Sequence, residues 1–154
     1  DRAFDRIAEN YPDIETQSLL VDAACMDFIR KPEVFDVVVA SNLFGDILTD
    51  IGAIVTGSMG MAPSGNIDPE RRFPSMFEPV HGTAPDIVGT GKANPLAAIM
   101  SGSMMLRHLG EDEAADSVDN AALKIVELGE TLTPDLGGSS TTEQVGDAVV
   151  SALG

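Results

Sequence analysis

The chain has 154 residues, 44% hydrophobic and 22% charged, a composition typical of a folded globular protein rather than a disordered one. Twenty-five acidic residues against nine basic ones give a net charge of -16, which argues against binding to nucleic acid or to an anionic membrane surface. No apolar run approaches the roughly 20 residues of a membrane span and no secretory leader opens the sequence, so we expect a cytoplasmic protein.

The amino-terminal third of the chain alternates helix-forming and strand-forming patterns. Pro32 ends one predicted helix, because a proline disfavours helical conformation in the residue before it. The β-branched run at 35–40 is short and continuously apolar, as expected of a strand buried on both faces. Strands that alternate with helices predict an α/β fold. The expected elements are a helix around Phe4, Ile7 and Ala8, a strand at 16–21, a helix at 23–31, a strand at 35–40 and a helix that carries Asp46 and Asp50.

Two carboxylates lie four residues apart on the helix that follows the run at 35–40. Asp46 and Asp50 share one helix face, and the opposite face is apolar. The simplest interpretation is a solvated acidic face. Paired carboxylates also suit a hard divalent cation such as Mg2+ or Mn2+, which keeps its other positions for water and substrate. Asp22 follows the strand at 16–21, so all three aspartates are expected at the carboxyl ends of strands, where α/β proteins bind ligands.

The composition changes after residue 56, where glycine and proline become frequent, and we place a boundary between two parts of the chain there. Asn94 is expected to cap the next helix, with Pro95 at the first helical position. The other elements expected in this part are an extended or strand segment at 73–80, a glycine-containing loop after His81, a helix at 113–128, a loop at 133–138 and a last helix at 142–153 with Thr142 as its cap.

Three ordered motifs then carry a resemblance to a known family. Residues 41–50, 76–87 and 93–95 resemble the carboxyl-terminal half of the β-decarboxylating dehydrogenases, which include the isocitrate, 3-isopropylmalate, homoisocitrate and tartrate/D-malate enzymes. Within that family, the segment 72–77 is most similar to the tartrate/D-malate branch. The resemblance covers essentially the whole chain. It implies part of the two-lobe isopropylmalate dehydrogenase-like α/β fold, with residues 1–56 in the smaller, dimer-forming lobe and 57–154 in the larger, cofactor-binding lobe.

The resemblance also implies a metal site and a dinucleotide site. It assigns Asp46 and Asp50 to Mg2+ or Mn2+, with Asp22 contributed by the neighbouring subunit. The dinucleotide site is of a non-Rossmann type, and the chain has no Gly-x-Gly-x-x-Gly motif. The residues that the resemblance assigns to the cofactor are Glu78, His81, Gly82, Thr83, Ala84, Pro85, Asp86, Ile87 and Asn94.

Within this set, the side chains suggest different roles. Gly82 permits a close approach of the backbone to a phosphate. The carboxylate of Asp86 can accept hydrogen bonds from the adenosine ribose diol and would repel a 2′-phosphate, which favours NAD over NADP. We place His81 and Asn94 on the adenine side and Glu78 toward the nicotinamide.

The catalytic groups of the family are not in this segment. The arginines that bind the substrate carboxylates, the catalytic tyrosine and the catalytic lysine lie upstream of it, so we assign no catalytic residue here and expect the chain alone to be inactive. With the missing amino-terminal half, the protein is expected to oxidise and decarboxylate a malate-type 2-hydroxy acid, tartrate or D-malate, using NAD and the metal. The alternatives are a 3-isopropylmalate dehydrogenase and a catalytically inactive binding module of the same fold. A metal phosphohydrolase is disfavoured because no Asp-x-Asp nucleophile motif is present.

The apolar face of the helix that carries the aspartates needs a covering partner. Ile47, Ile51, Ile54 and Val55 continue this face past the carboxylates. The resemblance suggests a homodimer in which the same helix of a second copy packs against it across a two-fold axis. Asp22 would then serve the metal site of the other copy.

Overall fold

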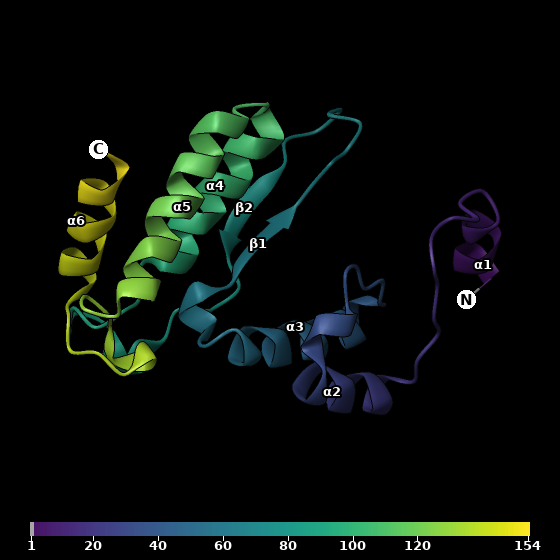
Figure 1. The fold of residues 1–154 in the computed structure, drawn as a ribbon, viewed down its shortest axis with the longest axis horizontal. Helices are drawn as coiled ribbons and strands as arrows, with labels where there is room; N and C mark the ends of the chain where they lie inside the picture. Colours follow the sequence, from purple (N-terminus) through teal and green to yellow (C-terminus); the bar gives the residue numbers. More distant parts are fainter. Residues whose placement is uncertain (1) are drawn as a thin grey trace. The chain divides into compact units, whose positions relative to one another are not determined.

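The computed structural model describes residues 2–154 (Figure 1). Contacts within the chain separate two compact units, one that ends at Ile51 and one that spans Gly52–Gly154. The division lies five residues before the boundary expected at residue 56, inside a helix that continues across it. No helix among the described residues is long and apolar enough to cross a membrane.

The first unit consists of short helices with a small interior. It contains α1 (Arg2–Ala8), α2 (Val21–Arg30), a 3-10 turn η1 (Pro32–Val34) and the start of α3 (Asn42–Val55). The rings of Phe28 and Phe35 pack against each other, with centroids 4.6 Å apart and planes tilted by 45°, and join α2 to the segment after η1. Among residues 2–51, the buried hydrophobic side chains are those of Ala24 and Leu48. Most apolar side chains of this unit are therefore exposed in the single chain.

The two strands predicted for this unit are absent from the structure. Residues 16–20 and 35–40 form no hydrogen-bonded ladder within the described part of the chain, and Val37 and Val39 are 86% and 75% exposed. A β-strand exists only when a neighbouring strand accepts and donates its backbone hydrogen bonds. The sequence pattern identified extended apolar segments, but the described residues contain no strand that pairs with them. Helix α2 also begins at Val21, so Asp22 lies in its first turn rather than at the end of a strand.

The second unit is built on a two-stranded antiparallel sheet covered by helices (Figure 1). Strand β1 (Pro63–Asn66) pairs with β2 (Met76–Pro79), and Pro63 lies opposite Pro79. The prediction of an extended segment at 73–80 is confirmed at its centre, whereas β1 was not predicted. Helix α4 (Leu96–Leu109) packs on both strands, α5 (Asp112–Leu128) packs on α4, and α6 (Thr142–Leu153) packs on α5.

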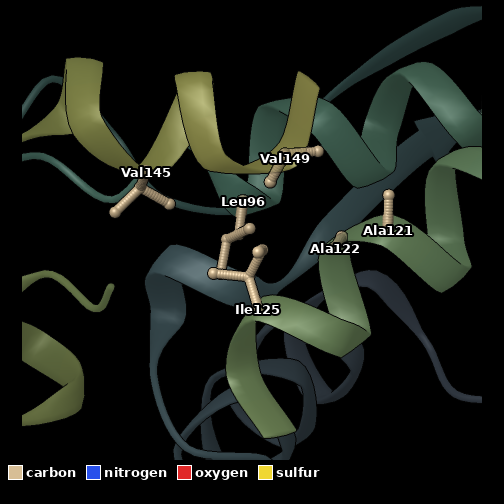
Figure 2. Close-up of a cluster of buried hydrophobic side chains, with 6 residues drawn as sticks. All are labelled: Leu96, Ala121, Ala122, Ile125, Val145 and Val149. Atoms are coloured by element: carbon tan, nitrogen blue, oxygen red, sulfur yellow. The ribbon is translucent and has the colours of Figure 1, made fainter. Parts of the chain in front are cut away.

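One cluster of buried side chains holds the three helices of this unit together (Figure 2). Leu96 is 1% exposed and lies at the centre of it, between α5 and α6. The alanines on α5 leave room for the other helices to approach closely. The members of the cluster are Leu96 from α4, Ala121, Ala122 and Ile125 from α5, and Val145 and Val149 from α6.

The ends of these helices follow local signals, with two corrections. Helix α4 begins at Leu96, so Pro95 immediately precedes the helix instead of being its first residue as predicted. The side-chain oxygen of Asn94 accepts the backbone N–H of Leu96 at 3.0 Å, so Asn94 still satisfies an N–H at the start of α4. Helix α6 is capped by Thr141 rather than the predicted Thr142: Thr141 and Gln144 form a reciprocal capping box. The hydroxyl of Thr142 instead donates a hydrogen bond to the carbonyl of Ala93 and ties α6 to the loop before α4.

Candidate functional site

Asp46 and Asp50 lie one turn apart on α3, and both are exposed. Leu48, between them in sequence, is buried on the other side of the helix. The hydroxyl of Thr49 donates to the carbonyls of Gly45 and Asp46, so this side chain is bound to its own helix. Two exposed carboxylates on one face fit the preference of Mg2+ or Mn2+ for one or two carboxylate ligands, with water or substrate in the remaining positions.

Asp22 is held at the start of a different helix of the same unit. Its carboxylate accepts the backbone N–H of Ala23 at 2.8 Å, in the first turn of α2. Residues 2–154 contain no group of three His, Cys, Asp or Glu side chains close enough together to hold a metal ion. The single chain therefore does not unite Asp22 with Asp46 and Asp50. The expected site takes Asp22 from a second copy, so the three-aspartate site stays a prediction.

The apolar side of α3 is largely uncovered. Ile54 is 64% exposed, and other large side chains on this helix are open to solvent as well. A row of exposed aliphatic and aromatic side chains on one helix is the pattern of a surface that another molecule covers. The exposed apolar residues of α3 are Leu43, Phe44, Ile47, Ile54 and Val55.

The residues predicted to bind the cofactor lie on the connection from β2 to α4. Glu78 is on β2, opposite Ser64 of β1. His81 follows the strand, and its Nδ1 lies 3.1 Å from the carbonyl oxygen of Gly82. Among residues 2–154, and leaving out Gly82 and its two chain neighbours, no atom lies within 4 Å of the position that a Cβ on Gly82 would occupy, so this backbone is accessible to a ligand.

The middle of this loop is exposed and has a distinctive backbone. Ala84 has a left-handed conformation with φ of 41°, which is uncommon for a residue with a side chain. It leads into a 3-10 turn, η3 (Pro85–Ile87), on which Asp86 is exposed. An exposed carboxylate on a turn is free to accept hydrogen bonds from a diol. Thr83 is exposed as well, so the loop presents several groups to solvent.

Both ends of the loop are fixed to other parts of the second unit. At the first end, the N–H of Val80 donates to the carbonyl of Ala62 at 3.0 Å. At the second end, the N–H of Thr142 donates to the carbonyl of Gly91 at 2.8 Å. Asn94 is buried, 8% exposed, and both ends of its side-chain amide are used within the protein.

Asn94 belongs to a polar cluster that the sequence did not predict. Its Nδ2 donates to a carboxylate oxygen of Asp135 at 2.9 Å, and the hydroxyls of Ser58 and Thr133 donate to the same carboxylate. We call Ser58, Asn94, Thr133 and Asp135 the Asp135 cluster. Partial burial opposes ionisation of Asp135, but the hydrogen bonds from Ser58, Thr133 and Asn94 outweigh it, so the pKa of this carboxyl lies below its ordinary value. The sequence only indicated a loop at 133–138.

Two adjacent glycines shape the end of that loop. Gly137 has φ of 81°, a left-handed conformation that glycine adopts readily. A side-chain carbon on Gly138 would overlap the carbonyl oxygen of Leu132. The N–H of Gly138 donates to the carbonyl of Thr133 at 3.1 Å, which closes the turn around Asp135.

The arginines of the second unit are engaged within the chain. Arg107 on α4 contacts Asp116 and Asp119 of α5 at 2.8 and 2.9 Å. Arg72 pairs with Glu70 at 2.8 Å, and the guanidinium of Arg71 donates to the carbonyl of His108 at the end of α4.

Comparison with known proteins gives a consistent set of similarities. A family model described as isocitrate/isopropylmalate dehydrogenase matches residues 1–149. The chain is 51% identical to the D-malate dehydrogenase [decarboxylating] of Escherichia coli, over 99% of this chain and 44% of that protein. It is 49% identical to the 3-isopropylmalate dehydrogenase of Corynebacterium jeikeium, over 99% and 43%. The crystal structure of isocitrate dehydrogenase from Methylococcus capsulatus matches with a TM-score of 0.90 and 44% identity, over 96% of this chain and 43% of that one. The chain thus spans less than half the length of these relatives.

Proposed function

The chain belongs to the isocitrate/isopropylmalate dehydrogenase family, and we propose that the full-length protein catalyses the NAD- and metal-dependent oxidative decarboxylation of a malate-type 2-hydroxy acid. The observation that carries this proposal is the exposed pair Asp46 and Asp50 on α3, in a chain that matches the carboxyl-terminal part of that family. A divalent cation at such a pair supplies Lewis acidity for the oxidation and for the loss of CO2.

The residues of this chain supply ligands and positioning rather than proton transfer. Asp46 and Asp50 would provide two metal-binding oxygens, and Asp22 of a second copy would provide a third. The catalytic acid and base belong to the part of the protein that precedes this segment in the relatives. The activity therefore requires both parts, and we expect residues 1–154 alone to reduce no NAD.

The proposed cofactor is NAD because of Asp86. Its exposed carboxylate on η3 can accept two hydrogen bonds from the 2′- and 3′-hydroxyls of an adenosine ribose. The same negative charge would repel the 2′-phosphate of NADP. Gly82, with open space around it, would let the backbone approach the pyrophosphate.

The substrate is proposed from the branch of the family that the segment 72–77 resembles. The segment 72–77 is similar to the tartrate/D-malate enzymes, and the chain is 51% identical to the Escherichia coli D-malate enzyme. We therefore propose D-malate or tartrate. The 49% identity to the Corynebacterium jeikeium enzyme makes 3-isopropylmalate the second candidate.

The exposed apolar face of α3 supports a homodimer in which α3 of one copy packs against α3 of the other. Such an isologous contact would bury the side chains that the single chain leaves exposed. The dimer would also bring Asp22 of one copy to Asp46 and Asp50 of the other.

The proposal is tested with the purified full-length protein. NADH formation is measured with D-malate, tartrate and 3-isopropylmalate, with Mn2+ present and after chelation, and with NADP in place of NAD. We expect NADH only with metal, and faster with D-malate or tartrate than with 3-isopropylmalate. Turnover that is insensitive to chelation, or the absence of turnover with all three substrates, would contradict the proposed function.

A further inference from the structure

The carboxylate of Asp135 joins three segments that are far apart in the sequence. Ser58 precedes a 3-10 turn, η2 (Met59–Met61), Asn94 precedes α4, and Thr133 precedes the turn η4 (Pro134–Leu136). All three donate hydrogen bonds to the carboxylate. Ser58 and Asn94 are 7% and 8% exposed, and Thr133 is 1% exposed. Each donor therefore depends on Asp135 as its acceptor, because a buried polar group without a partner is costly.

The η2 turn is packed directly against this cluster. The N–H of Gly60 donates to the hydroxyl of Ser58 at 3.0 Å. A Cβ atom on Gly60 would lie 2.6 Å from Cβ of Asn94 and 2.8 Å from a carboxylate oxygen of Asp135. The turn can approach Asn94 this closely only because residue 60 has no side chain.

The residues that follow the η2 turn also bind the first end of the proposed cofactor loop, at Val80. Ala62, just after η2, accepts the N–H of Val80, and Pro63 lies opposite Pro79 in the sheet. The loop between Val80 and Asn94 is thus attached at its first end to the segment that follows Ser58. Asp135 then connects Ser58 to Asn94 at the second end. The carboxylate closes the base of the loop.

We propose that Asp135 is a positioning residue for the cofactor: by binding Ser58 and Asn94 together, it fixes the distance between the two ends of the loop that binds NAD. This inference rests on the assignment of that loop to NAD in the proposed function. Asp135 itself does not need to touch the cofactor. Loss of the Asp135 carboxylate would leave the middle of the loop unchanged and increase the distance between the two ends of the loop. We therefore expect weaker binding of NAD and an unchanged rate of the chemical step.

The test uses three separate variants of the full-length protein: Asp135→Asn, Ser58→Ala and Gly60→Ala. Asparagine keeps the size of the side chain but replaces one carboxylate oxygen with an amide nitrogen that cannot accept. It therefore cannot keep both the hydrogen bond from Thr133 on one oxygen and those from Ser58 and Asn94 on the other. Alanine at position 60 keeps every hydrogen-bonding group and pushes the turn away from Asn94 and Asp135. We expect each variant to raise the KM for NAD by about fivefold to tenfold. We expect kcat and the KM for the 2-hydroxy acid to stay within about twofold of the parent.

Two matched controls separate positioning from general stability. Asp116→Asn removes a carboxylate that holds Arg107 across α4 and α5 of the same unit. Gly146→Ala adds a side-chain carbon on α6 at a position with no described atom within 4 Å, apart from the chain neighbours and the nearby backbone of the helix itself. Both are expected to leave the KM for NAD unchanged, even if Asp116→Asn lowers the Tm.

The rise in Tm on addition of NAD measures binding without turnover. A selective rise in the KM for NAD, with a smaller NAD-induced rise in Tm, supports the proposal. A lower Tm with an unchanged KM for NAD in the variants overturns it, because Asp135 is then merely structural. If Asp135→Asn does not fold, the KM for NAD and the NAD-induced rise in Tm of Ser58→Ala and Gly60→Ala test the proposal in the same way. If the parent neither reduces NAD nor responds to it in Tm, the proposed function fails, and this inference falls with it.

Discussion

Truncation of Ile54 to alanine is expected to weaken the proposed dimer by a measurable amount. Ile54 is 64% exposed on α3 in the single chain. Full burial of an isoleucine side chain contributes about 1.5–3 kcal/mol, so burial of the part now exposed would contribute about 1–2 kcal/mol in each copy. A two-fold interface counts the residue twice, which gives about 2–4 kcal/mol and raises the dimer dissociation constant by about 30- to 700-fold.

Sedimentation velocity over a range of protein concentrations measures this dissociation constant for the full-length protein. Val150→Ala is the control, because Val150 is 67% exposed but belongs to α6 and not to the apolar face of α3. It should leave the dissociation constant unchanged. Equal dissociation constants for the parent and Ile54→Ala would refute the assignment of the apolar face of α3 to the dimer, as would a parent that is a fully active monomer.

Three further predictions concern the metal site, the cofactor loop and the Asp135 cluster. Asp46→Asn should lower Mn2+ affinity and turnover while NAD affinity stays nearly unchanged, and identical Mn2+ titrations for variant and parent would contradict the metal site. Asp86→Lys should weaken NAD and improve the relative use of NADP, because an attractive charge then faces the 2′-phosphate; an unmoved ratio of kcat/KM for the two cofactors would remove Asp86 from the ribose. Because the pKa of Asp135 lies below its ordinary value of 3.8 in the folded protein, its ionisation stabilises the fold above that value and this contribution is lost as the pH falls through the folded-state pKa. The difference in Tm between the parent and Asp135→Asn should therefore shrink in acid, and a difference that is independent of pH would contradict this.

The elements that could be predicted from the sequence are those whose signals are local. Asn94 followed by Pro95 located the start of α4, and the helical pattern of residues 113–128 located α5, each to within one residue. The strand predictions at 16–21 and 35–40 were wrong because a strand is not determined by local signals alone. A strand depends on a partner that its own sequence does not specify, and the described residues provide none.

In the candidate site, too, the features with local signals were predicted and those that depend on long-range contacts were not. The positions of Asp46 and Asp50 on one helix face follow from their spacing of four residues and were predicted. The Asp135 cluster was missed because its hydrogen bonds join residues 41 and 77 positions apart in the sequence. Thr133, Pro134 and Asp135 look like an ordinary turn until the fold brings Ser58 and Asn94 to them.

Gly137 and Gly138, at the end of that turn, are glycines for different structural reasons. Gly137 is required for its left-handed backbone, a conformation that asparagine also tolerates. Apart from its chain neighbours, no described atom lies within 4 Å of where its Cβ would be. Gly138 does not share that conformation and is required because the carbonyl of Leu132 occupies the space. In a library of functional variants randomised at both positions, asparagine should be recovered at 137 and only glycine at 138. A sequence profile that gives both glycines the same score would therefore predict the wrong set of tolerated substitutions at each position.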